Sequence, residues 1–194
     1  MSKKEDIIET ALDLFNRFSY GSIGVDRIIL ESGVAKMTFY KYFPSKENLI
    51  EACLVRRNEN IQAAILNELA SYKEVDYLGK IKGIYTWYLN WFKSEDFHGC
   101  MFQKATFEVL KQYPSVMRPI ENYREWIHQL AEDLCTNLDV SQPQILTSMF
   151  INILDGMTVY ANMNPDYEQI EQSWGYIEKL ITLEQSSLKL RFAS

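Results

Sequence analysis

Residues 33–46 read Gly-Val-Ala-Lys-Met-Thr-Phe-Tyr-Lys-Tyr-Phe-Pro-Ser-Lys, and this stretch decides the fold. It follows a short apolar helix pattern at residues 25–31, and Gly33 suits the positive φ of a tight turn. A short helix should follow over residues 36–42 and end before Pro44, because proline disfavours helix at the preceding residue. The stretch therefore predicts two helices joined by a tight turn, the helix-turn-helix motif.

The second helix of this motif should have an apolar inward side and a polar outward side. We expect it to pack with two preceding helices into a three-helix bundle, whose core would hold Phe15, Ile28, Val34, Phe39 and Phe43. Its outward side chains include cations, a hydroxyl group and phenols, which suit the phosphates and base edges of a DNA groove. The predicted DNA-contacting residues are Lys36, Met37, Thr38, Tyr40, Lys41, Tyr42 and Lys46.

These residue types divide by their chemistry. Lys36 and Lys41 are placed for phosphates, and Lys46 would form a further anion site with the unpaired N–H groups at the start of the next helix. Thr38 and Met37 stand where base edges are expected, and Met37 offers an apolar contact to a thymine methyl group. The alternative is an ordinary short surface helix with solvated lysines.

Residues 25–49 carry a family resemblance. They read Val-Asp-Arg-Ile-Ile-Leu-Glu-Ser-Gly-Val-Ala-Lys-Met-Thr-Phe-Tyr-Lys-Tyr-Phe-Pro-Ser-Lys-Glu-Asn-Leu, which resembles the DNA-binding signature of the tetracycline-repressor (TetR) family. The resemblance extends over residues 7–52. It implies a homodimeric repressor that leaves a two-fold operator when a small molecule binds its C-terminal domain. Gly24 stands where the family often has threonine and Met37 where it often has glycine, which affects the operator sequence rather than the motif.

The net charge of −6 is unusual for a protein that binds nucleic acid, but the acidic excess is local. Of the 20 basic and 26 acidic residues, nine of each lie in residues 1–60, which leaves 11 basic and 17 acidic residues for residues 61–194. Within residues 33–57 the net charge is +3, from five basic and two acidic residues. A local basic face is sufficient, because salt screens charges beyond about 8–10 Å.

Apolar periodicity predicts helices along the whole chain. The expected ranges are 3–19, 25–31, 36–42, 46–72, 75–93, 100–112, 116–138, 142–161 and 166–184. We therefore predict an all-α fold of about nine helices, and we expect the tail after Gln185 to be loose. The domains would be residues 1–46, the helix-turn-helix domain, and residues 47–194, which the resemblance makes a ligand-binding and dimerisation domain.

Aromatic and methionine side chains are abundant in residues 75–161, and a helical bundle can hold a cavity between such helices. The resemblance implies a ligand pocket there. The predicted pocket residues are Tyr88, Trp91, Cys100, Phe107, Glu108, Tyr123, Trp126 and Met157. Plain core packing is the alternative for each aromatic residue. Glu108 and Asp155 would either pair with a cationic ligand or be solvated carboxylates.

Residues 142–161 are apolar almost all round, so that helix is either buried or meets a partner. The resemblance implies a homodimer formed by the last two long helices. The predicted interface residues are Phe150, Ile153, Met157, Trp174, Ile177 and Ile181. Two-fold pairing of two copies would match two half-sites on DNA.

Three cysteines, odd in number and widely spaced, favour a reducing cytoplasm over a disulfide framework. Cys100 follows Gly99 at a predicted helix start, where the helix dipole lowers a thiol pKa, and Lys104 lies one turn on. A redox- or electrophile-sensing role is therefore one interpretation of Cys100, and a buried unreactive thiol is the other. No apolar stretch reaches the ~18 residues of a membrane span, and no cleavable signal opens the sequence.

An enzyme is the contrasting class. The chain has only two histidines and lacks the usual zinc, phosphate-loop and nucleophile-elbow motifs, although a pair of carboxylates could still act. We therefore expect no catalysis, no metal and no cofactor. The expected partners are an operator in double-stranded DNA, a second copy of the chain and an unidentified small-molecule effector. A DNA-binding architectural protein without a ligand is a further alternative, but it would not need an aromatic-rich acidic half.

Overall fold

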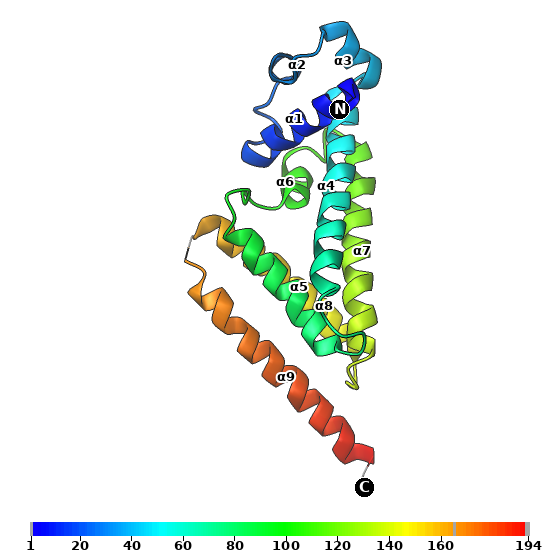
Figure 1. Cartoon of the computed structure of the whole chain (residues 1–194), viewed down its shortest axis with the longest axis vertical. Coiled ribbons are helices and arrows are strands. Elements are labelled where there is room, and N and C mark those ends of the chain that lie inside the picture. Colours follow the sequence, from blue (N-terminus) through cyan, green and yellow to red (C-terminus); the bar gives the residue numbers. More distant parts are fainter. Residues whose placement is uncertain (1, 165, 193–194) are drawn as a thin grey trace. The chain divides into compact units, whose positions relative to one another are not determined.

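The protein is built from α-helices (Figure 1). The computed structural model describes residues 2–164 and 166–192, with side chains up to Ser186. In that part of the chain nine α-helices and one 3₁₀ helix form and no strand does, which confirms the predicted fold class. The helices are α1 (Lys3–Arg17), α2 (Val25–Ser32), α3 (Lys36–Tyr42), α4 (Lys46–Leu69), α5 (Tyr77–Phe92), α6 (Met101–Glu108), η1 (Pro114–Val116), α7 (Met117–Thr136), α8 (Pro143–Met163) and α9 (Glu168–Phe192).

Each predicted helix is present, with its ends moved by a few residues. The largest difference is at α9, which continues to Phe192 although we expected a loose tail after Gln185. Residues 176–192 hold no glycine or proline that would end a helix, which accounts for the extension. Residues 193–194 lie outside the described residues.

The chain forms two compact units. The first consists of Met1–Gln62 and His98–Tyr123, and the second of Ala63–Phe97 and Arg124–Ser194. The first unit therefore holds α1, α2, α3 and α6, the second holds α5, α8 and α9, and α4 and α7 contribute residues to both. This grouping differs from a boundary between residues 46 and 47, which remains a prediction about where the DNA-binding domain ends.

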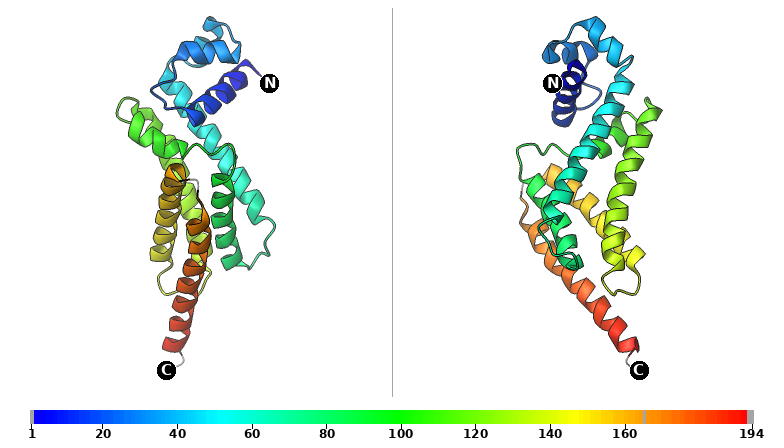
Figure 2. Two further views of the ribbon diagram at one scale, coloured as in Figure 1. Left: turned by 90° about the vertical axis from the view of Figure 1, so that its left-hand side faces the viewer. Right: turned by 45° about the vertical axis from the view of Figure 1, so that its right-hand side comes forward.

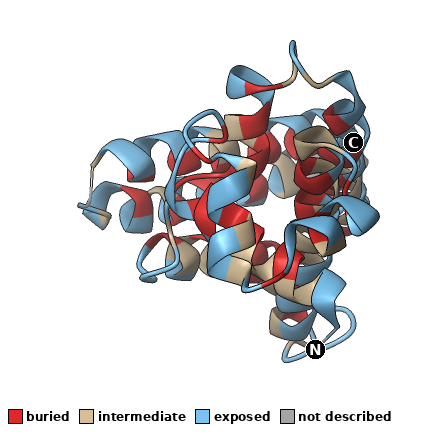
Figure 3. Ribbon diagram, turned by 90° about the horizontal axis from the view of Figure 1, so that it is seen from above, coloured by how far each residue is buried: buried red, intermediate tan, exposed pale blue. Residues whose placement is uncertain are grey.

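In the first unit, α1 packs against α2 and α3 around an apolar core. The helices carry buried residues along one side and exposed residues along the other (Figure 3). All five predicted core residues of the bundle are buried: Phe15, Ile28, Val34, Phe39 and Phe43. The amphipathic pattern of the sequence thus predicted correctly which side chains face the core.

Local backbone signals fix the turn and the helix starts. Gly33 ends α2 with φ = 65°, the left-handed conformation that favours glycine. Ser45 precedes α4, and its hydroxyl oxygen accepts a hydrogen bond from the Asn48 N–H at 3.2 Å, which caps the helix. Gly24 precedes α2 and offers no such side-chain cap. The helix-turn-helix geometry therefore follows from a few residues close together in sequence.

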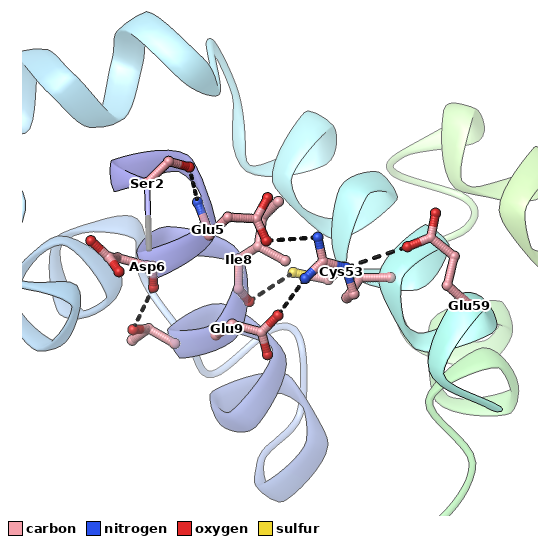
Figure 4. Close-up of polar contacts among 9 residues, drawn as sticks. Ser2, Glu5, Asp6, Ile8, Glu9, Cys53 and Glu59 are labelled. Atoms are coloured by element: carbon pink, nitrogen blue, oxygen red, sulfur yellow. Dashed lines mark hydrogen bonds and ion pairs between the residues drawn. The ribbon is translucent and has the colours of Figure 1, made fainter. Parts of the chain in front are cut away.

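Polar contacts join Glu5 and Glu9 of α1 to α4 in the first unit (Figure 4). The Arg56 guanidinium on α4 bonds the carboxylates of Glu5 and Glu9 on α1, at 2.7 and 2.6 Å. The Cys53 thiol, one turn earlier on α4, donates to the Ile8 carbonyl oxygen at 3.8 Å, and burial raises the pKa of this thiol. Polar contacts thus fix α1 to the first turns of the long helix α4.

In the second unit, α5 lies alongside α8 and α9 (Figures 1 and 2). The Tyr85 hydroxyl on α5 donates to the Ile170 carbonyl oxygen on α9, and its ring centroid lies 5.4 Å from that of Trp174. Burial raises the pKa of Tyr85 to about 12. Within the described part of the chain, no helix is both long enough and apolar enough to cross a membrane.

Candidate nucleic-acid interface

Helix α3 has one inward aromatic anchor and a largely exposed outer side. Phe39 is fully buried in the bundle. Met37 is 87% exposed, the rings of Tyr40 and Tyr42 are exposed in part, and Thr38 is half-buried. The structure therefore places the predicted DNA-contacting residues of α3 together on one short helix, held by a single deep side chain.

The two lysines of α3 are exposed and weakly held. The Lys36 ammonium lies 3.2 Å from an Asp26 carboxylate oxygen on α2, with the two side chains 66% and 84% exposed. The Lys41 ammonium lies 5.9 Å from the ring centroid of Tyr42. Exposed ion pairs contribute only about 0–1 kcal/mol, so both cations could turn to a phosphate at little cost.

Lys46, the seventh predicted residue, has a different environment. It is half-buried at the start of α4, and its ammonium donates to the Tyr20 carbonyl oxygen at 2.5 Å. Burial lowers the pKa of Lys46, while the nearby Glu108 carboxylate raises it. The Lys46 ammonium thus binds the backbone of the loop between α1 and α2. A contact from Lys46 to a DNA phosphate remains a prediction.

Tyr20 connects the loop after α1 to α4 and α6, and the sequence alone does not predict this role. Its side chain is fully buried, and its hydroxyl group donates to the Met101 carbonyl oxygen on α6 at 3.1 Å. Its backbone N–H donates to a Glu108 carboxylate oxygen at 2.7 Å, and its carbonyl oxygen accepts from Lys46. Every polar group of Tyr20 is therefore bound by α4 or α6.

A second lysine fastens α6 to the end of α1. The Lys104 ammonium donates to the carbonyl oxygens of Phe15 and Asn16, at 3.0 and 2.8 Å, where the last carbonyls of α1 lack partners inside the helix. Burial lowers the pKa of Lys104, and the Glu108 carboxylate opposes that shift. Tyr20, Lys46, Lys104 and Glu108 together form a polar cluster, the Tyr20 cluster.

Comparison with known proteins identifies this arrangement. Residues 7–53 match the family model described as bacterial regulatory proteins, tetR family. A stretch of 68 residues is 44% identical to an uncharacterized HTH-type transcriptional regulator, YuxN, of Bacillus subtilis (strain 168). That stretch is 34% of this chain and spans only 23% of the length of the relative. Residues 7–53 form a DNA-binding domain of the TetR family.

Solved structures of TetR regulators share the fold over nearly the whole chain. The regulator SCO4454 of Streptomyces coelicolor aligns with a TM-score of 0.82 and 21% identity, covering 94% of this chain and 96% of that one. Reduced NemR of E. coli aligns with a TM-score of 0.74 and 20% identity, covering 91% and 96%. At these identities the likeness establishes the fold, and the matched residues 7–53 establish the helix-turn-helix domain of the TetR family.

Four predicted ligand residues lie in the first unit. Cys100 is buried immediately before α6, and Tyr123 stacks on Phe102 with 4.1 Å between ring centroids. Phe107 is 87% exposed, and Glu108 belongs to the Tyr20 cluster. The bond from the Tyr20 N–H to Glu108 favours a structural role for this carboxylate, which holds α6 against the loop after α1. A ligand role for Glu108 and a sensing role for Cys100 remain predictions.

The other four predicted ligand residues lie in the second unit. Tyr88 and Trp91 belong to a chain of aromatic contacts on α5 and the segment that follows it. Trp126 is half-buried and Met157 is buried. Asp155, which we considered for a cationic ligand, forms an ion pair with Arg124 at 2.6 Å. The aromatic cluster of α5 therefore remains a predicted wall of the ligand pocket. The Asp155 carboxylate, by contrast, is already paired with the Arg124 guanidinium.

The six predicted dimer residues mostly face their own protomer. Five are buried within the single chain: Phe150, Met157, Trp174, Ile177 and Ile181. Ile153 is half-buried. The prediction that α8 and α9 meet a second copy remains. The apolar side chains that these helices expose are different from the six predicted ones.

We expect Glu108→Ala to destabilise the protein by about 1–2 kcal/mol, because the N–H of buried Tyr20 would lose its acceptor. Denaturant unfolding measures the effect. Glu121→Ala, at an exposed glutamate on α7 in the same unit, is the matched control and should change stability by less than about 0.5 kcal/mol. Equal effects of the two substitutions would contradict the role assigned to Glu108.

We expect Asp26→Asn to strengthen DNA binding about 1.5- to 5-fold, because it removes a negative charge from the proposed DNA face and releases Lys36 from an exposed ion pair. Fluorescence anisotropy with a labelled duplex measures the affinity. Asp13→Asn removes a similar exposed partner, that of Arg17 on α1, and should leave the affinity unchanged. Weaker binding by the Asp26 variant would count against Lys36 as a phosphate contact.

Proposed function

We propose that this chain is a homodimeric transcriptional repressor that acts in the cytoplasm and leaves a two-fold DNA operator when a small molecule binds. Residues 1–46 would bind DNA, and residues 47–194 would bind the effector and the second copy. The observation that carries the proposal is helix α3, which is anchored by Phe39 and exposes two lysines beside Met37 and Thr38 within the matched TetR domain. The proposal assigns the protein no catalytic role.

The positions of side chains along α3 support the proposed DNA contacts. A recognition helix presents base-reading side chains from its N-terminal part, while cations near both ends position it on phosphates. In this chain Met37 and Thr38 occupy the first turn, with Lys36 before them and Lys41 near the end. We propose Tyr40 and Tyr42 as hydroxyl donors to phosphate.

The proposed dimer surface rests on a second, largely apolar stripe of α8, opposite its buried side, in which Asn152 is the one polar side chain. Exposed residues recur on α8 at the helical spacing of four, three, four, three and four: Ile145, Met149, Asn152, Gly156, Val159 and Met163. A Cβ atom added to Gly156 would meet nothing within 4 Å, so a second helix could approach closely there. A helix with two opposite apolar sides needs a partner on each.

Helix α9 repeats this arrangement. Tyr176 is 74% exposed and Leu183 is 65% exposed, and both lie opposite the buried side chains of Trp174 and Ile177. The stripes of the two helices adjoin, because Ile145 and Met149 of α8 line one cleft with Leu180 of α9. We propose that this joint surface pairs with itself across a two-fold axis.

Effector binding would act on DNA affinity through α6 and α4. The proposed ligand wall is the aromatic cluster of α5 in the second unit, with Tyr88 and Trp91 at its centre. Allosteric coupling of ~1–3 kcal/mol would change operator affinity about 5- to 150-fold. The Tyr20 cluster supports this route, because it ties α6 and α4 to the loop that enters the helix-turn-helix.

Selection of bound duplexes from a random DNA pool at two salt concentrations tests DNA binding. We expect a two-fold symmetric motif whose binding weakens as salt rises.

Lys36→Ala should flatten the salt dependence, by about 0.9 in the slope of log K against log salt for each phosphate that the variant no longer neutralises. Lys179→Ala, on α9, is the control. No enrichment above random DNA would overturn the proposal.

Leu183→Glu should move the protein from dimer toward monomer, because it places a charge in the proposed interface. Sedimentation velocity over a range of concentrations measures the change, and we expect the dissociation constant to rise about tenfold or more. Thr182→Glu adds the same charge at the adjacent exposed position on the flank of α9 and is the matched control. A monomeric wild-type chain, or an unaltered dimer in the Leu183 variant, would refute the assigned surface.

A further inference from the structure

The most exposed large side chain of the recognition helix is apolar. Met37 is 87% exposed at the second position of α3, while Val34, Phe39 and Phe43 supply the apolar contacts that fix this helix in the bundle. Met37 therefore contributes little to the fold. An unbranched thioether side chain held in water gains free energy only when a partner covers it.

The chemistry of the DNA groove limits what that partner can be. Base edges in the major groove carry hydrogen-bond donors and acceptors, and their one apolar group is the C5 methyl of thymine. Methionine has no donor and only a weak sulfur acceptor, so it cannot replace arginine, asparagine or glutamine in reading polar edges. Lys36 and Thr38, its neighbours in the first turn, can make the polar contacts around it.

We propose that Met37 is a specificity-determining residue that selects a T·A pair in each half-site by burying its side chain against the thymine methyl group. The inference rests on the proposed DNA binding through α3. It adds the base identity at one operator position and the chemical group that is read there.

The test removes that methyl group without changing base pairing. Each thymidine of the selected operator is replaced by deoxyuridine, symmetrically in both half-sites, and the duplexes are titrated by fluorescence anisotropy at constant salt. For the wild-type protein we expect one position to weaken binding by about fourfold per half-site, from the burial of one methyl group. For Met37→Ala the same substitution should have no effect.

Two further variants separate methyl recognition from loss of the helix. Leucine is also apolar and also favours a helix, so Met37→Leu should still bind the uridine duplex more weakly than the thymine duplex. Met37→Gln should lose the uridine effect, since glutamine reads adenine through hydrogen bonds. Leu30→Ala removes another exposed apolar side chain, 80% exposed on α2, and should leave the uridine effect as in wild type.

A converse experiment puts the methyl group back on another base. With cytosine at the sensitive position, 5-methylcytosine restores a methyl group at the same place in the groove. Wild-type protein should bind the methylated duplex about fourfold per half-site more tightly than the unmethylated one. Met37→Ala should bind the two equally.

The outcomes distinguish this inference from the proposed function. A pool that yields no enriched sequence overturns DNA recognition itself. An enriched, salt-sensitive operator with no uridine-sensitive position overturns only the role of Met37. A uridine effect that survives in Met37→Ala, or disappears in Leu30→Ala, also overturns it, because another side chain would then contact the methyl group.

Discussion

The first unit depends on the burial of one tyrosine with all of its polar groups bound. Tyr20 has no exposed surface, and its N–H, carbonyl and hydroxyl groups bond Glu108, Lys46 and Met101. A buried backbone or hydroxyl group left without a partner costs about 1–3 kcal/mol, so the loop after α1 cannot move unless α4 and α6 move with it. The helix-turn-helix begins directly after this loop, and its position is therefore set by two helices outside the motif.

Features encoded by neighbouring residues could be predicted from the sequence. Gly33 and Phe39 act within a few residues of where they stand, and the structure has both in their expected roles. The Tyr20 cluster could not be predicted in this way. Tyr20 lies in a loop 88 residues before Glu108, and no local sequence pattern indicates that the two residues meet. Glu108 looked like a lone carboxylate in an apolar pattern, which is why a ligand role was assigned to it.

The predicted dimer residues illustrate a different limit of sequence reasoning. Helix α8 is apolar on two opposite sides, and α9 has large apolar side chains on both sides as well. Helical periodicity identifies such sides but cannot say which one packs against the chain's own core. Trp174 and Ile177 pack inward, and Tyr176 and Leu183 are left outside. Periodicity therefore assigns the predicted interface to residues of α8 and α9 that face the chain's own core.

In the proposed function, the Tyr20 cluster would act as a switch rather than as a rigid joint. Lys104 makes two bonds to carbonyl oxygens at the end of α1, and Glu108 and Met101 each accept one from Tyr20. If each bond contributes on the order of 1 kcal/mol, the fastening of α6 totals a few kcal/mol. That is close to the ~1–3 kcal/mol of a typical allosteric coupling. Under the proposed function, a much weaker fastening would transmit nothing to the DNA-binding helices, and a much stronger one could not be released when one small molecule binds.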